Sequence, residues 1–452
     1  MGILIKIFIL IFCLMNFYGC VSSSQKEEIL AYVNGKPVTT RDLEYPLKII
    51  HRKQYLSHAK KLDLTKLVED TINDILITNE ARSMGMSEMP QVKKAVQEYI
   101  ITESVRKLYD EEIKKKIYIT EEEIKKYYES KKGAEATAEE IEKFKESIIK
   151  NLRKQKEKEI SDAYLKQLRT KASIEINNEI LSSIKIDNPD ELKKYSEDKR
   201  QLCKVNETVL TVGEFISIIK SYSSGFSNEI SKESILNNWI DSKVVDYEAL
   251  SRNYMNDPDF KNKVIQYEDQ ILKRAFIENI LIPKIKISEE SLKEFYLKNK
   301  DRYITSPKYK FMQISVKTLE EAQNILKSLE NGADFLWLAQ KNSNAPIETG
   351  WLSKEEMLSD LRELVERLKP GETTPVIKTG SSYAVFKLLE IKEGTLQDFD
   401  KIKNNVYNDY YNEQIKNLYN EYANELRKDA KIEIIQNNID LFEKKLLRGR
   451  DE

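Results

Sequence analysis

An internal repeat constrains this chain more than any other feature of its sequence. The stretch ITEEEIKKYYESKK, which begins at Ile119, returns as ISEESLKEFYLKNK from Ile287, an offset of 287 − 119 = 168 positions. Glu80 returns as Glu248 at the same offset, inside related helical runs. Self-similarity at a fixed offset is the signature of a repeated structural unit. The sequence therefore predicts two copies of one helical module.

The second copy is interrupted by an insertion. Leu168 returns as Leu426, where the offset has grown to 426 − 168 = 258 positions. The difference, 258 − 168 = 90 residues, places an inserted segment of that size between Lys300 and Leu426. Such a segment suits one small domain, which can sit in a loop of its host when its two ends lie close together.

The inserted segment has a pattern of its own. Residues 309–316 alternate like a strand, and helices are expected at 319–329, from 335 and around 361–368. Two further strands are expected at 374–378 and 383–391, which gives the order β-α-α-α-β-β. The fold class predicted for the whole chain is therefore mainly α with an inserted α+β domain.

Motifs in the insertion resemble the parvulin prolyl isomerases. They are ENGADFLWLAQKNS, the following Gly350-Trp351, LKPGETTPVIKT and SSYAVFKLLE. Together with VNGKPVTTRDLE near the N-terminus, they make most of the chain similar to the SurA and PrsA class of extracytoplasmic chaperones. The resemblance implies two SurA-N-like helical chaperone modules and one parvulin-like domain.

The same resemblance locates the candidate site residues. Active parvulins line the floor of their site with two histidines and a Cys or Asp. Aligned on the motifs, the two histidine positions fall on Gln313 and Ala384, and the Cys or Asp position falls on Ala345. Met357 and Leu361 fall where the family has its apolar pocket, although ordinary helix packing is an equal alternative for both. The resemblance implies a domain that binds apolar or prolyl segments but is a poor catalyst.

The first residues predict export. The apolar run 7–15 is too short to span a bilayer, so a cleaved signal is favoured over a membrane helix. Gly19-Cys20 resembles a bacterial lipobox, which would place a lipid anchor on Cys20. An ordinary secretory signal with an incidental cysteine is the alternative. With Cys13 removed in the signal and Cys20 acylated, Cys203 would be the single thiol of the mature chain, and we expect it to be packed and unreactive.

The predicted boundaries combine these observations. They are 1–19 for the signal peptide, 20–28 for a tether, 29–200 for the first module, 201–305 for the second module, 306–393 for the parvulin-like domain, 394–436 for the helix and strand that complete the second module, and 437–452 for a charged tail that frays. Asn34-Gly35 predicts a tight hairpin turn. The strand SIEIN at 173–177 is expected to return and pair with AYVNG at 31–35, closing the first module.

Composition excludes several function classes. The formal net charge is −1, from 74 basic and 75 acidic residues, whereas a nucleic-acid protein would show a basic excess. His51 and His58 lie in HRKQYLSH without partners at metal-ligand spacing, so we expect no metal and no cofactor.

Three functions follow. The first is a lipid-anchored chaperone that binds unfolded or nascent exported polypeptides. The second is an active prolyl isomerase with a rearranged site. The third and weakest is a structural lipoprotein that docks through the long helix predicted at 138–171.

Overall fold

The computed structural model describes residues 27–43, 47, 63–132, 137–185, 193–223, 231–345 and 347–448. The predicted signal peptide, Cys20, His51 and His58 lie outside the described residues. The chain forms two compact units, residues 1–279 with 422–452 and residues 280–421. Among the described residues, no helix combines the length and the apolar composition of a membrane span.

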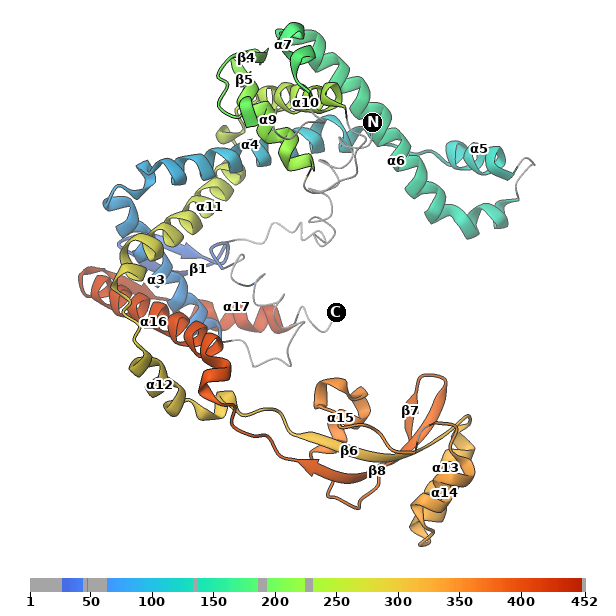
Figure 1. Cartoon of the computed structure of the whole chain (residues 1–452). Coiled ribbons are helices and arrows are strands. Elements are labelled where there is room, and N and C mark those ends of the chain that lie inside the picture. The colour runs from blue at the N-terminus through green and yellow to red at the C-terminus, as the bar shows by residue number, and fades with distance from the viewer. Residues whose placement is uncertain are drawn as a thin grey trace. The chain divides into compact units, whose positions relative to one another are not determined.

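The first unit is mainly helical (Figure 1). Its long helices are α3 (Leu64–Ser83), α4 (Pro90–Glu112), α5 (Glu121–Lys132), α6 (Ala138–Lys171), α9 (Val212–Ser223), α10 (Lys232–Ser251) and α11 (Pro258–Phe276). The long helix predicted at 138–171 is confirmed. The first turn of α5 is capped, because the N–H of Glu123 donates to Thr120 Oγ1 over 3.2 Å.

The two repeats meet at equivalent residues. The rings of Tyr99 on α4 and Tyr267 on α11 stack with centroids 4.0 Å apart and an interplanar angle of 4°. These two tyrosines are themselves related by the repeat, since 267 − 99 = 168. A residue that contacts its own counterpart lies on a two-fold axis. The repeats are therefore arranged like the two subunits of a symmetric dimer, with α3 against α11 and α10 against α4.

Each repeat begins with a β-hairpin. The strands are β1 (Ile29–Val33) and β2 (Lys36–Thr39) in the first repeat, and β4 (Gln201–Val205) and β5 (Thr208–Thr211) in the second. Asn34 and Asn206 open the two turns with φ of 50° and 49°. Because the left-handed backbone suits Asn and Gly, the tight turn predicted at Asn34-Gly35 is confirmed.

Each hairpin is completed by a strand from the other repeat. β3 (Ile174–Ile176), which follows α6, pairs antiparallel with β4 and sets Ile174 opposite Val205. β9 (Ile432–Ile434), which follows α16 (Phe399–Asp429), pairs with β1 and sets Ile432 opposite Val33. The resulting sheets have the orders β3-β4-β5 and β2-β1-β9.

The expected pairing of SIEIN with AYVNG is therefore wrong. Both closing strands read Ile-Glu-Ile, so the local sequence cannot distinguish their partners. The contacts are equivalent too: Ser173 N–H donates to Asn206 Oδ1 over 3.0 Å, and Lys431 N–H donates to Asn34 Oδ1 over 2.8 Å. Connectivity favours the observed partner of β3, because a shorter loop loses less entropy on closing.

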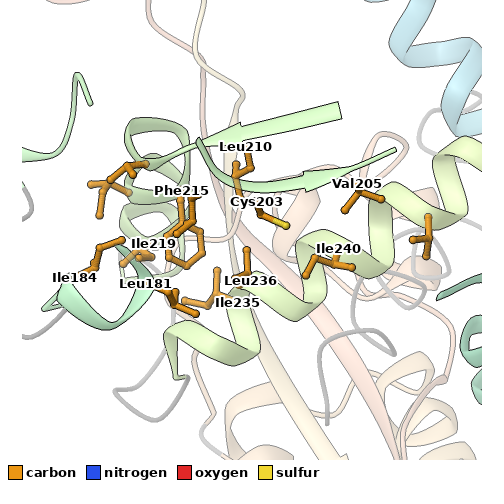
Figure 2. Packing of buried hydrophobic residues seen from close by; sticks show 14 of the residues in the cluster. Leu181, Ile184, Cys203, Val205, Leu210, Phe215, Ile219, Ile235, Leu236 and Ile240 are labelled. Carbon is orange, nitrogen blue, oxygen red and sulfur yellow. The ribbon is translucent and has the colours of Figure 1, made fainter. Parts of the chain in front are cut away.

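The core of the second hairpin contains the lone described cysteine. Figure 2 shows Cys203 among Leu210, Phe215 and Leu236. Its side chain is fully buried, and burial raises its pKa to about 11. The thiol is therefore neutral at physiological pH, and the expectation of a packed cysteine is confirmed.

The predicted frayed tail is wrong for residues 437–448. These residues belong to α17 (Gln436–Arg448). Ile439 is 1% exposed and packs, with Phe442 and Leu446, against the core of the first hairpin. The three residues recur at the spacing of one helix face, a signal that the high charge of the segment concealed.

Replacing Asn206 by alanine should lower the free energy of unfolding by about 2 kcal/mol. Alanine disfavours the left-handed backbone and loses the hydrogen bond from Ser173 N–H. Asn206→Gly is the matched control, because glycine keeps the backbone and loses only the side-chain bond, at a cost of about 1 kcal/mol. Urea unfolding followed by circular dichroism measures both, and equal losses would contradict the backbone contribution.

The second unit holds the inserted domain. After α12 (Glu289–Lys298) and η6 (Lys300–Tyr303), its elements are β6 (Lys308–Val316), α13 (Leu319–Glu330), α14 (Phe335–Asn342), α15 (Ser359–Val365), β7 (Ile377–Thr379) and β8 (Ser382–Lys392). The predicted order β-α-α-α-β-β is confirmed. The antiparallel sheet has the order β6-β8-β7. Helices α13 and α14 pack on one face, and α15 packs on the other.

Candidate functional site

The candidate site lies on the face of the sheet that α15 covers. Gln313 on β6 is opposite Phe386 on β8, and Ser315 is opposite Ala384. Because side chains alternate between the faces of a strand, all four lie on one face. Gln313 and Ala384, the two positions that resemble the parvulin histidines, are therefore diagonal neighbours on adjacent strands.

The floor beside them is an apolar core. Ala384 is 1% exposed and belongs to one cluster with Met357 and Leu361, which are 5% and 1% exposed. The rings of Phe311 and Phe386 meet edge to face in the same cluster, with centroids 6.0 Å apart. The structure thus brings three of the five predicted site residues into direct packing. At the second histidine position the structure therefore has the methyl group of Ala384, surrounded by apolar side chains.

Ala345 lies outside this cluster, beside the edge of β6. The N–H of Asn344 donates to Ser315 O over 2.7 Å, and the N–H of Ser315 donates to Ser343 Oγ over 3.2 Å. The segment after α14 therefore runs along the strand that carries Gln313. Ser343 and Ser315 supply the nearby hydroxyl groups, and Ala345 supplies none.

Thr374 is a polar floor residue that the sequence did not single out. It is 1% exposed, its Oγ1 accepts from the N–H of Phe386 over 3.0 Å, and its N–H donates to Phe386 O over 2.8 Å. The sequence predicts a strand at 374–378 that begins with Thr374, whereas the observed strand β7 begins at Ile377. A β-branched residue in a strand is ordinary, so only its burial in three dimensions marks it.

The loop before α15 is held firmly. The guanidinium of Arg362 donates to Met357 O over 3.1 Å and to Lys354 O over 2.8 Å. The N–H of Ser353 donates to the Glu356 carboxylate over 2.7 Å. These hydrogen bonds hold the loop in the conformation that buries Met357 against the sheet.

Two lysines of the domain form ion pairs with glutamates. Glu348 raises the pKa of Lys310, 2.7 Å away, and Glu366 raises the pKa of Lys354. Both are surface ion pairs. In the part of the chain that the structure describes, no three His, Cys, Asp or Glu side chains gather closely enough to hold a metal ion.

Met357→Ala should lower the free energy of unfolding by about 2–4 kcal/mol, the usual range for truncating a buried methionine. Leu358→Ala is the matched control, because Leu358 is 44% exposed and its truncation should cost less than about 0.5 kcal/mol. Thermal unfolding of both variants tests the packing. Similar small losses would show that Met357 is available to a ligand instead of the core.

The PPIC-type PPIASE domain family matches residues 287–404. The chain contains a parvulin-type domain. This chain is 25% identical over 263 residues to the foldase protein PrsA of Clostridium tetani. This alignment covers 54% of this chain and 76% of PrsA. The chain is 29% identical over 216 residues to Cbf2 of Campylobacter jejuni, covering 45% of this chain and 78% of Cbf2.

A solved SurA-like chaperone of Campylobacter jejuni is 24% identical, over 52% of this chain and all of that chain, with a TM-score of 0.31. The match at 287–404 and the likeness to PrsA confirm the resemblance inferred from the sequence motifs. The parvulin-type match also extends on both sides of the β-α-α-α-β-β core, into α12 and the beginning of α16.

Proposed function

We propose that this protein is an extracytoplasmic chaperone, anchored by a lipid on Cys20, that binds unfolded or nascent exported polypeptides, and that its parvulin-type domain is a poor isomerase. One observation carries the proposal. The domain has its complete fold, yet the two positions that resemble the catalytic histidines hold the amide of Gln313 and the buried methyl group of Ala384.

Isomerisation requires more than a fold. Rotation about a peptide bond meets a barrier of about 18–20 kcal/mol. A catalyst lowers it by seating the proline ring and by placing polar groups around the twisting amide. The side chain of Ala384 cannot donate or accept a hydrogen bond, and the hydroxyl oxygen of Thr374 accepts the N–H of Phe386. The two histidine positions therefore offer only one neutral amide and one methyl group to a twisting prolyl bond.

The relatives support the binding role. One is named a foldase, PrsA, and another is named a periplasmic chaperone, PpiD of Buchnera aphidicola, which is 25% identical over 166 residues, 35% of this chain and 26% of PpiD. A protein that binds the unfolded state holds back its aggregation by mass action, without any reaction. This activity needs no cofactor and no metal.

Aggregation of reduced lysozyme, followed by light scattering with and without the chain from Val21 onward, tests the chaperone role. An equimolar amount should reduce the scattering severalfold. The control is an equal mass of an inert protein. Scattering equal to that control would remove the chaperone role and favour the structural lipoprotein.

A separate fractionation tests the anchor. The full chain should partition with bacterial membranes and incorporate labelled fatty acid, because several acyl chains anchor a protein stably. Cys20→Ser should appear in the soluble fraction and lose the label. Membrane partition of Cys20→Ser equal to the parent would contradict the anchor.

A further inference from the structure

The α5–α6 arm ends in an aromatic surface. The two helices pack through Ile124, Ile148 and Leu152. Near the end of the arm the rings of Tyr128 and Phe144 lie 6.0 Å apart, and Phe144 is 47% exposed. We define the arm tip as the surface formed by Tyr127, Tyr128, Ile141 and Phe144.

The second repeat contains the same surface, and there it is covered. Tyr128 corresponds to Tyr296, since 296 − 128 = 168, and Phe144 corresponds to Ile402, since 402 − 144 = 258. Tyr296 and Ile402 are only 8% and 7% exposed, and both belong to the cluster between α12 and α16. A surface left open in one repeat is thus closed in the other.

The cover in the second repeat is a tyrosine at the end of the short helix η6, just before the chain becomes extended at Ile304. The ring of Tyr303 lies 5.5 Å from the ring of Tyr296 and is 4% exposed. Tyr303 is followed by Ile304, which bridges to Leu396 in extended conformation. The hydroxyl of Tyr296 donates to the backbone oxygen of Gln397 over 2.6 Å. The surface therefore accepts both an aromatic ring and a backbone carbonyl.

The sequence of the first repeat offers no aromatic residue at the position of Tyr303, because 303 − 168 = 135 is Glu135. Residues 133–136, which follow α5, read Gly-Ala-Glu-Ala, whereas Tyr303 follows α12 in the second repeat. Phe144 keeps almost half of its surface exposed. A large apolar side chain left open where its counterpart is covered marks an interaction surface.

Two lysines lie over the rings of the arm tip. The ammonium groups of Lys131 and Lys143 lie over the rings of Tyr127 and Phe144, 5.9 and 5.8 Å from their centroids. An extended polypeptide would offer an aromatic ring to Phe144 and carbonyl oxygens to the lysines.

We propose that the arm tip binds an aromatic side chain of an extended, unfolded polypeptide, in the way that the second repeat holds Tyr303. The inference rests on the proposed chaperone function and names a place where the client binds. Phe144 and Tyr128 supply the apolar contact, and the hydroxyl of Tyr128 corresponds to the one that contacts backbone in the second repeat.

Photo-crosslinking tests this site. p-Benzoylphenylalanine is placed at position 144 and, as the control, at position 118, since Tyr118 is 74% exposed and lies outside the arm tip. The probe is reduced, carboxymethylated α-lactalbumin, which stays unfolded. Position 144 should crosslink about fivefold more than position 118, although Tyr118 is more exposed. The peptide KDRYITS, residues 300–306, should compete, and the same peptide with Tyr303→Ala should not.

Each outcome has a meaning. Equal yields at the two positions, or competition by both peptides, would overturn the inference. Crosslinks to a second copy of the chain would show that the arm tip mediates self-association and does not bind an unfolded polypeptide. Suppression of aggregation without crosslinking at position 144 would leave the chaperone function standing and remove this site. Crosslinking at position 144 without suppression of aggregation would support this site and remove the chaperone function.

Discussion

Removing residues 431–452 is expected to unfold the first hairpin, almost 400 residues away in the sequence, and to spare the second. The truncation removes β9 and α17, and with them Ile432, Ile439 and Phe442 from the core around Leu30. Full burial of one such side chain contributes roughly 1.5–3 kcal/mol, so the loss should reach about 5 kcal/mol. Hydrogen exchange locates it: amides of β1 should lose protection, and those of β4 should keep it because β3 still pairs with them.

A point substitution separates packing from truncation. Ile439→Ala should lower the free energy of unfolding by about 2–4 kcal/mol, whereas Leu441→Ala on the same helix should have little effect because Leu441 is 52% exposed. Loss of protection in β4 and not in β1 after the truncation would mean that each repeat closes its own hairpin.

Arg169→Ala is expected to destabilise the protein by about 3 kcal/mol, far more than the equivalent change in the other repeat. Arg169 forms an ion pair with Asp241, which is 7% exposed, so its removal leaves a buried carboxylate without its partner. The repeat places Arg427 at the equivalent position, where its guanidinium donates to the neutral Asn73 over 2.6 Å. Arg427→Ala should cost only about 1 kcal/mol.

The stability loss of Arg169→Ala should depend on pH. Burial raises the pKa of Asp241 more than Arg169 lowers it, so the folded state binds a proton more readily than the unfolded state. A carboxyl with a raised pKa weakens the fold as the pH rises through that pKa. The deficit of Arg169→Ala should therefore be greatest near neutral pH and shrink in acid. Asp241→Asn should rescue it, and a deficit that is independent of pH would contradict the buried-carboxylate explanation.

The sequence predicts the helices and turns of this protein well, because their signals are local. The span of α6 and the turn at Asn34 both depend on neighbouring residues. The exchange of closing strands could not be predicted in this way. Both strands read Ile-Glu-Ile, and both hairpins offer an Asn to the residue before the strand. Identical local chemistry leaves the choice of partner to connectivity and to the packing of the helices.

Some features of the candidate site could also be predicted from the sequence, and others could not. Strand alternation alone puts Gln313 and Ala384 on one face once their pairing is known, and the resemblance to parvulins supplied the positions. The roles of Ser343 and Thr374 were not predictable, because they arise from hydrogen bonds between segments distant in the sequence. Whether Met357 and Leu361 bind a ligand is a separate question from their packing, and the substitutions at Met357 and Leu358 address it.

A protease-coupled isomerisation assay on short X–Pro peptides, using the chain from Val21 onward beside an active parvulin, tests the central claim most directly. The absence of histidine from the floor predicts a rate at background. A rate within about tenfold of the active parvulin, a barrier difference of about 1.4 kcal/mol, would contradict the claim and show that Gln313 and its neighbours sustain catalysis.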